Sequence, residues 1–355
     1  HGFPVGLVQC ESNLIGTVTG KGINVGSGGW TNIIEKYSRA KSYCDAPFEV
    51  RKQGRHKVTV PIPGEWIGEL RNGAPTRSVT LRCSSSTNLA LPPASLDAVF
   101  TDPPYFGNVQ YGELMDFCYV WLRRLVGTEP EGFDRPSSRS TDELTGDATQ
   151  ARGIDHFADG LSAVYQTMAR ALKPGAPLAF TFHHNRPEPY HAVGVAILDA
   201  GLSCLATLPC PAEMGGSIHI HGTGSSIVDT IFICRRQGRT RSGQFFSSLD
   251  QLAQLMEGEL AQLRAAGMKP TAGDVRCMVY GHLTRYAIER LRTGWDSLRP
   301  TAERLDSIAR TELGLGDCQA LIDRLAAGRP AAASGSARGV QLPLFPEDDR
   351  DAVSL

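Results

Sequence analysis

The chain has 355 residues, of which 41% are hydrophobic and 21% are charged, and its formal net charge is −1. This is the composition of an ordinary globular protein, with room for one large α/β core and attachments. No apolar run approaches the ~20 residues that span a bilayer, and the first residues do not form a signal peptide. The balanced charge excludes a globally basic protein, so contacts with nucleic acid have to come from local patches.

Nine cysteines are scattered along the chain without a C-x-x-C pair. This spacing argues against a zinc site and favours reduced, buried thiols in a cytoplasmic protein, with no bound metal. The first residue is His1 instead of Met, which indicates a fragment whose upstream sequence is missing.

Residues 1–75 are rich in glycine and turn signals and form an N-terminal segment or insert. Within it, the apolar spacing predicts a short amphipathic helix over Asn32–Cys44. The basic stretch Arg51–Lys57 then predicts a turn, either as a solvated hairpin or as a contact for phosphate.

Residues 76–237 alternate between strand and helix patterns. Strands are predicted at "SVTLRCSSS", "LDAVFTD", "APLAFTFHH", "LSCLATLPC" and "SIVDTIFICRR", and helices at "DHFADGLSAVYQTMARALKPG" and "PYHAVGVAILDAG". Near-continuous apolar runs are typical of parallel strands that are covered on both faces. The alternation therefore predicts a doubly wound, Rossmann-like α/β sheet.

Three further segments complete the expected organisation. A helical stripe from Leu114 to Leu125 predicts a core-packed helix, and the polar residues 127–153 that follow predict an exposed, mobile loop. Residues 238–327 carry mostly helical signals and form a helical annex. Residues 328–355 are a low-complexity tail, for which we expect disorder.

The apolar run that ends at Phe100 is followed by Asp102, Pro103, Pro104 and Tyr105. In an open parallel sheet, ligands bind at the carboxyl ends of the strands, where this tetrapeptide is expected. The prolines stiffen the turn and leave carbonyl groups free. A carboxylate beside a free carbonyl offers two acceptors, which suit the exocyclic amino group of a nucleobase, and the tyrosine ring offers a face for stacking. A base reaches such a pocket only after leaving the duplex.

These residues carry a family resemblance. The sequence D-P-P-Y after an apolar strand resembles a motif of the amino-methyltransferases, which transfer a methyl group from S-adenosylmethionine to adenine N6 or cytosine N4. The longer stretch "TDPPYFGNVQYGELMDFCYVWLRR" resembles the large bacterial adenine-specific DNA methylases, some of which carry a zinc ribbon. The resemblance covers roughly residues 35–290 and includes "YSRAKSYCDAPFEV" and "LKPGAPLAFTFHH".

The resemblance implies a role for each residue of the motif. Asp102 and the Pro104 carbonyl would accept hydrogen bonds from the target amine, Tyr105 would stack on the base, and Phe106 would help to wall the pocket. The amine would then lie in line with the methyl sulfonium, with positioning supplying most of the rate. Asp at the first position favours adenine, although cytosine N4 and RNA remain alternatives.

The chain departs from the family pattern at the cofactor site. The F-x-G-x-G motif that would hold the methionine part of S-adenosylmethionine is absent, and we expect it upstream of His1. Ser84, Ser85 and Ser86 stand where the adenosine part would bind and an acidic residue is common. A nucleic-acid-binding fragment without catalysis therefore stays open as another class of function.

Other stretches carry weaker predictions. His183 and His184 follow a predicted strand, and His183 is a candidate for substrate contact. Gly215–Ser226 is a candidate substrate loop. DNA phosphates are the expected partners of four arginines, Arg235, Arg236, Arg239 and Arg241. The tail segment "QLPLF" resembles the pentapeptide that docks on the bacterial sliding clamp, through Gln341, Leu342, Leu344 and Phe345.

Overall fold

The computed structural model describes residues 17–18, 24–25, 30–54, 56–62, 80, 82, 84–130, 132–212, 226–236 and 246–328. The chain divides into two compact units, His1–Cys83 and Ser84–Leu355. Among the helices of the described part, none combines the length and the apolar character needed to cross a membrane.

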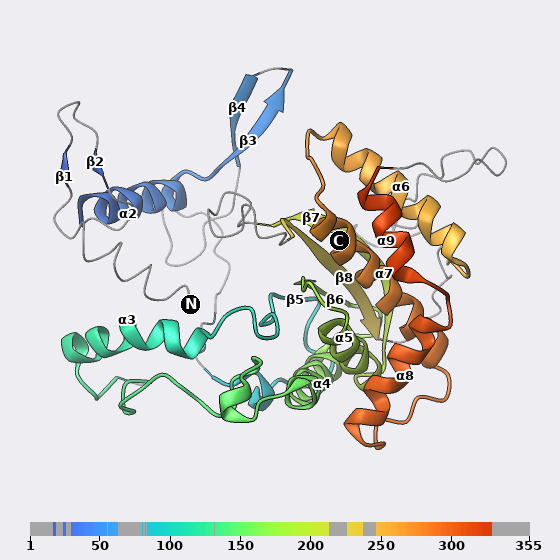
Figure 1. Cartoon of the computed structure of the whole chain (residues 1–355). Coiled ribbons are helices and arrows are strands. Elements are labelled where there is room, and N and C mark those ends of the chain that lie inside the picture. Colours follow the sequence, from blue (N-terminus) through green and yellow to red (C-terminus); the bar gives the residue numbers. More distant parts are fainter. Residues whose placement is uncertain are drawn as a thin grey trace, which may run out of the picture. The chain divides into compact units, whose positions relative to one another are not determined.

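The first unit contains one helix and two antiparallel strand pairs in its described residues (Figure 1). Its elements are β1 (Thr17–Val18), β2 (Asn24–Val25), α2 (Trp30–Asp45), β3 (Phe48–Gln53) and β4 (His56–Pro61). Gly54 adopts a φ of 63° in the turn between β3 and β4, a conformation that glycine reaches without steric cost. The predictions of a helix over Asn32–Cys44 and of a hairpin at the basic stretch are confirmed.

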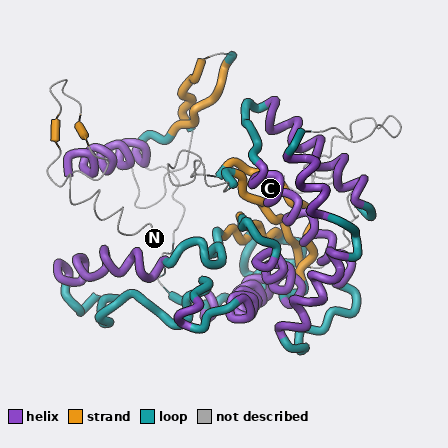
Figure 2. The backbone as a smooth tube through the Cα atoms, viewed as in Figure 1, coloured by secondary structure: helices purple, strands orange, loops and turns teal. Residues whose placement is uncertain are grey.

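The second unit is a mixed α/β structure around one sheet, which has four strands in the described residues (Figure 2). The strands β5 (Val99–Thr101), β6 (Pro177–Phe182), β7 (Leu202–Pro211) and β8 (Val228–Arg236) lie in the order β5-β6-β8-β7. β5 and β6 run parallel, whereas β8 runs antiparallel to both of its neighbours. The expectation of a parallel sheet is therefore wrong for the part of the sheet formed by β8 and β7. These two strands follow each other in the chain and pair directly as antiparallel strands.

Helices make up most of the rest of this unit. They are α3 (Tyr111–Val126), α4 (Ile154–Ala171), α5 (Glu188–Asp199), α6 (Leu249–Ala265), α7 (Ala272–Leu291), α8 (Thr301–Leu313) and α9 (Cys318–Ala326), with 3-10 turns η1 (Ser86–Asn88) and η2 (Ala148–Gln150). α4 packs on α5, and α7 packs on β7 and β8. The predicted strand at "SVTLRCSSS" lies largely outside the described residues, and its end forms the bend that leads into η1.

The alternation of side chains along β6 and β8 separates the two faces of the sheet. Leu178, Phe180 and Phe182 of β6 are buried, and the register places Phe180 opposite the buried Phe232 of β8. The residues between them are only half-buried. Because side chains of a strand alternate between faces, the polar residues of the second face are kept out of the core and near solvent.

α3 forms where the helical stripe predicts a helix, but its apolar side chains are not in the core. No residue of α3 is buried, and Trp121 and Leu125 are 59% and 81% exposed. α3 is instead fixed through polar contacts between its first turns and residues 137–143. Core packing of this stripe is therefore a prediction that the described structure contradicts.

Candidate functional site

The tetrapeptide from Asp102 to Tyr105 begins directly after β5 ends at Thr101. Asp102 is exposed, Pro103 is buried, and Pro104 and Tyr105 are half-buried. The backbone then turns, with the Asn108 amide donating to the Tyr105 carbonyl at 2.9 Å and Gly107 at a φ of 68°. A buried proline with a fixed φ holds the carboxylate of Asp102 at the surface of a stiff corner.

The Asp102 carboxylate is held by two hydroxyl groups. The Thr181 hydroxyl of β6 donates to Oδ1 of Asp102 at 2.5 Å, and the Tyr105 hydroxyl donates to the same oxygen at 2.9 Å. The two hydroxyl oxygens lie 3.0 Å apart. Within the described residues Oδ2 has no hydrogen-bond partner, so one carboxylate oxygen is anchored and the other is open.

Burial raises the pKa of the Tyr105 phenol well above its usual value, and the negative charges of Asp229 and Asp102 act in the same direction. Tyr105 therefore keeps its proton at neutral pH and stays a hydrogen-bond donor. Its ring packs edge-on against Phe182 and His183, at centroid distances of 5.4 and 4.7 Å. The ring is thus fixed at both its hydroxyl end and its sides.

His183 follows β6 and pairs with an acid of β8. Its Nδ1 lies 2.6 Å from Oδ1 of Asp229, and the two side chains are 23% and 14% exposed. The pairing of Phe182 with Thr230, extended by one residue, places His183 opposite Asp229. The register of the antiparallel pair therefore brings this histidine and this acid together.

His184 lies on the other side of the chain and is packed. It is buried, its Nδ1 accepts a hydrogen bond from the Arg186 amide at 3.1 Å, and its ring lies 6.3 Å from that of Phe106. Burial, followed by the charge of Arg186, lowers the pKa of His184 to about 4. It is neutral at pH 7 and is a structural histidine.

Phe106 is anchored towards the core. Its ring packs at 5.3 Å from the ring of Phe157, and a Cβ atom added at Gly146 would lie 2.7 Å from it. Position 146 therefore has space for glycine alone, because any side chain there would displace the Phe106 ring. The role of Phe106 as a wall of the substrate pocket stays a prediction.

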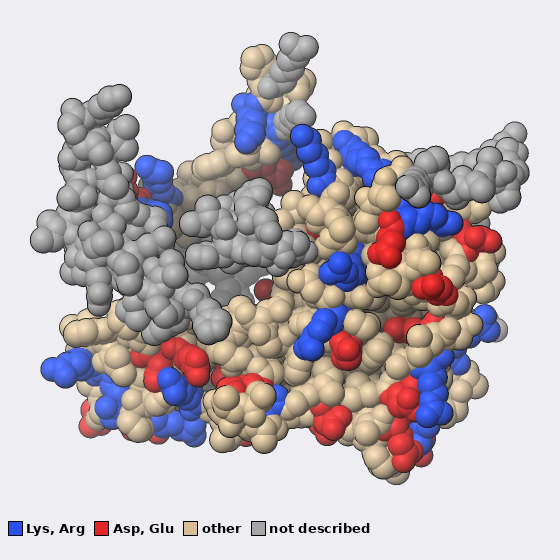
Figure 3. Space-filling view, in the orientation of Figure 1, with Lys and Arg blue, Asp and Glu red and all other residues tan. Residues whose placement is uncertain are grey.

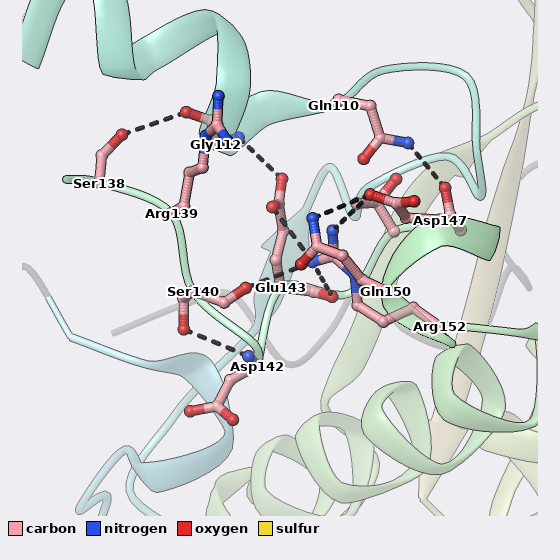
Figure 4. A network of polar contacts seen from close by, with 12 residues as sticks. Gln110, Gly112, Ser138, Arg139, Ser140, Asp142, Glu143, Asp147, Gln150 and Arg152 are labelled. Atoms are coloured by element: carbon pink, nitrogen blue, oxygen red, sulfur yellow. Dashed lines mark hydrogen bonds and ion pairs between the residues drawn. The ribbon is translucent and has the colours of Figure 1, made fainter.

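A polar network ties residues 140–152 to the segment that follows the corner (Figure 4). Gln110 donates to the Gly146 carbonyl at 2.7 Å, and the Gly112 amide donates to Oε1 of Glu143 at 2.8 Å. The buried Arg152 guanidinium lies 3.3 Å from carboxylate oxygens of both Glu143 and Asp147. The charged residues of this stretch bind one another and the backbone of the segment that follows Tyr105, and the mobility expected for the loop stays a prediction.

The comparisons with known proteins give one distant likeness. No protein-family profile and no curated protein sequence matches the chain. A solved structure from Thermus thermophilus, described as a "Putative DNA Modification Methylase", is similar at 15% sequence identity. The match covers 56% of this chain and 83% of that chain, with a TM-score of 0.25.

The predicted cofactor residues Ser84, Ser85 and Ser86 are exposed at η1. The Ser85 hydroxyl pairs with the Thr87 hydroxyl at 2.8 Å, and η1 lies against α4. These are polar groups open to a ligand, and their binding of S-adenosylmethionine stays a prediction.

The predicted nucleic-acid contacts fall only in part on described residues. Arg235 and Arg236 end β8, and Arg236 is exposed, whereas Arg239 and Arg241 lie outside the described residues. The same is true of residues 215–225 of the candidate substrate loop and of the clamp-like residues Gln341, Leu342, Leu344 and Phe345. On the face in Figure 3, basic and acidic side chains of the described residues are intermingled.

Two residues of the site, Thr181 and Asp229, were missed from the sequence. Both are polar residues in largely apolar strands, at positions that alternate with Phe180 and Phe182 in β6 and with Val228 and Thr230 in β8. The two-residue period was a usable signal, because it places Thr181 and His183 on one face, away from the core. The pairing of the strands, which brings Asp229 to that face, was not visible in the sequence.

Proposed function

We propose that the chain is the catalytic part of a nucleobase amino-methyltransferase, which transfers a methyl group from S-adenosylmethionine to N6 of adenine in DNA. The observation that carries the proposal is the carboxylate of Asp102. It stands exposed after a strand of the sheet, with Oδ1 anchored by Thr181 and Tyr105 and Oδ2 free of partners in the described residues.

An exocyclic amino group carries two hydrogens and needs two acceptors. Oδ2 of Asp102 supplies one, and the Pro104 carbonyl, which accepts no backbone hydrogen bond from the described residues, supplies the other. Held by both hydrogens, the amine would present its lone pair in a fixed direction. Positioning of this kind supplies a large part of the rate in a transfer that needs no covalent enzyme intermediate.

Tyr105 would stack on the base that the two acceptors hold. Its hydroxyl is tied to Asp102 and Thr181, so the plane of the ring is set by the same contacts that set the carboxylate. A base that enters the corner has to leave its duplex, at a cost of a few kcal/mol. Stacking of the base on this ring offsets part of the cost, because the Tyr105 side chain is already ordered and loses little conformational freedom on binding.

The polar residues of the unit fit part of what S-adenosylmethionine requires. The exposed hydroxyls of Ser84, Ser85 and Ser86 would bind the adenosine part. The negative charge of the Asp102 carboxylate would attract the positively charged sulfonium group of the donor. The bound donor supplies an activated methyl group. Arg235, Arg236, Arg239 and Arg241 would contact DNA phosphates, and Gln341, Leu342, Leu344 and Phe345 would dock on the sliding clamp.

Transfer of a labelled methyl group tests the proposal. The chain is incubated with tritiated S-adenosylmethionine and with duplex DNA, single-stranded DNA or RNA, and the modified base is identified by mass spectrometry. We expect N6-methyladenine in DNA, and we expect Asp102→Ala to lower the rate by about 10²–10³-fold, because it removes a group that faces the reacting nitrogen.

Asp97→Ala is the matched control, since Asp97 lies before the same strand in an exposed ion pair with Lys173 and contributes little to stability. Transfer that survives Asp102→Ala would contradict the assigned role of the carboxylate. Methylated cytosine or methylated RNA would correct the substrate, and binding of DNA without any transfer would contradict the enzymatic function itself.

A further inference from the structure

We propose that His183, oriented by Asp229, accepts the proton that the target amine releases during methyl transfer. The inference rests on the proposed function and adds a catalytic residue and a positioning residue to it. His183 is the group that would touch the substrate, and Asp229 acts through His183.

The sheet places His183 on the same side as the anchored carboxylate. Thr181 and His183 are two residues apart along β6 and its extension, so their side chains share one face and stand about 7 Å apart along the strand. Thr181 contacts Asp102, and the His183 ring contacts Tyr105, which also contacts Asp102. A base held by Asp102 and stacked on Tyr105 would therefore lie beside the imidazole.

Asp229 determines which nitrogen of His183 can accept a proton. The carboxylate of Asp229 accepts a hydrogen bond from Nδ1, so the hydrogen of the neutral ring is on Nδ1 and the lone pair is on Nε2. In the described residues, Asp229 is the sole hydrogen-bond partner of this side chain. The ring is 23% exposed, which leaves it open to a ligand.

The other polar groups of the corner are less suited to accept this proton. Oδ1 of Asp102 already accepts from Thr181 and Tyr105, and its Oδ2 is assigned to holding the amine. The Tyr105 phenol keeps its own proton, because burial raises its pKa. His184 is buried and its Nδ1 is used by the Arg186 amide.

Methyl transfer and deprotonation together need no further reactant. The lone pair of the amine nitrogen forms a bond to the methyl carbon while the bond from that carbon to sulfur breaks, and the electron pair of the broken bond stays on sulfur, which becomes a neutral sulfide. The nitrogen, now positively charged, breaks its hydrogen bond to the Pro104 carbonyl and gives that hydrogen as a proton to Nε2 of His183, while Asp102 keeps the other hydrogen. The products are a methylated amine and an imidazolium, whose positive charge the Asp229 carboxylate stabilises until the proton passes to water.

Chemical rescue separates this role from a structural one. In single-turnover reactions we expect His183→Gly to be about a hundredfold slower than the unaltered chain, the usual contribution of a positioned base. Imidazole added to the solution should restore most of the rate in His183→Gly and none in Asp102→Ala. His183→Gln, which fills the space without a base, should be as slow as His183→Gly and unfold at the same temperature as the unaltered chain.

The hydrogen on the ring can be located without any activity. In the chain labelled with ¹⁵N-histidine, NMR should show the His183 hydrogen on Nδ1. In Asp229→Asn the amide can donate to Nδ1, so we expect the hydrogen to move to Nε2 and the transfer rate to fall at least about tenfold. Asp97→Asn is the matched control and should change neither the position of the His183 hydrogen nor the rate of methyl transfer.

The outcomes distinguish the inference from the function on which it rests. If the unaltered chain methylates DNA, Asp102→Ala does not, and His183→Gly is as fast as the unaltered chain or is not rescued, the inference is wrong and the function stands. A hydrogen on Nε2 in the unaltered chain overturns the inference alone. If the unaltered chain transfers no methyl group to any nucleic acid, both fall.

Discussion

At the scale of single residues, the candidate site depends on how one carboxylate is held. An exposed aspartate at a strand end would ordinarily sample several rotamers, but two hydroxyls converge on the same oxygen of Asp102. This leaves the second oxygen at a defined position. A hydrogen bond to a charged group is stronger than one between neutral groups, and two of them on one oxygen orient the side chain although Asp102 is exposed.

Replacement of Thr181 by valine tests this anchoring. Thr181→Val keeps the shape of the side chain and removes the donor to Asp102. We expect the methyl-transfer rate to fall about tenfold, which corresponds to about 1.4 kcal/mol, because Asp102 then loses one of the two hydrogen bonds that hold its Oδ1. Thr59→Val, at an exposed position of β4, is the control and should react at the unaltered rate. An unchanged rate in Thr181→Val would show that anchoring of Oδ1 has no part in the reaction.

At the scale of elements, a short buried charge network holds the segment that follows the corner. Arg152 is 5% exposed and binds Glu143 and Asp147, and Glu143 in turn accepts from the first turn of α3 (Figure 4). α3 buries no side chain of its own, so these contacts fix its start. The segment that follows Tyr105 is thus held in place by contacts with the loop of residues 140–152 and not by the packing of a buried helix.

Arg152→Met should therefore release this loop. The substitution leaves the carboxylates of Glu143 and Asp147 near each other without their cation, so we expect residues 140–152 to open more often. Hydrogen exchange of the Gly112 and Thr149 amides should be at least about tenfold faster, because both donate to these carboxylates. Arg139→Met, which removes an exposed cation, is the control. Equal protection in both variants would contradict the assigned role of Arg152.

The same loop should loosen in acid. The Thr149 hydroxyl, more than its amide or Arg152, holds the pKa of Asp147 below its usual value, and the Ser138 amide does the same for Asp116. A carboxyl with a lowered folded pKa stabilises the fold fully above its unfolded pKa, near 4, and loses this contribution as the pH falls towards the folded value. We expect amide protection in residues 137–152 to be constant from pH 7 to about 5 and to decrease below about pH 4. A constant protection down to pH 3 would contradict this.

At the scale of the whole second unit, α7 joins the sheet to the C-terminal helices. Its Ala287 and Ile288 belong to the core cluster of the sheet, whereas Val275 and Met278 belong to the cluster formed with α6 and α9. A Cβ added at Gly281 would lie 2.6 Å from Thr230 of β8, so helix and sheet are in close contact. The predicted helical annex therefore shares its central helix with the sheet.

Asp274 is the residue on which this junction can be tested. It is fully buried and accepts hydrogen bonds from Thr271 at the start of α7 and from Ser226 and Ile227 before β8. Asp274→Ala leaves buried donors unpaired, and we expect a loss of about 3 kcal/mol or more in the free energy of unfolding. Asp250→Ala, in the exposed first turn of α6, is the control.

Chemical denaturation followed by circular dichroism and by the fluorescence of Trp295, in a chain whose other three tryptophans are replaced by phenylalanine, measures this loss. Both signals should shift together, since α7 is common to both clusters and its loosening affects each of them. A difference between the midpoints of the Trp295 signal and of the helical signal of the second unit in Asp274→Ala would contradict the unfolding of this unit in one cooperative step.

The amino-acid sequence by itself determined the local elements and the corner. Helical periodicity predicted α2, α4 and α5, and an apolar run before two prolines predicted a stiff acid at a strand end, because both signals depend on near neighbours in the chain. Tertiary structure decided the rest. It made the sheet mixed, exposed α3 and brought Asp229 and Thr181 to the corner from positions 127 and 79 residues beyond Asp102 in the numbering. Strand order and register follow from how whole surfaces pack, and residues that are distant in the chain carry no local signal of that packing.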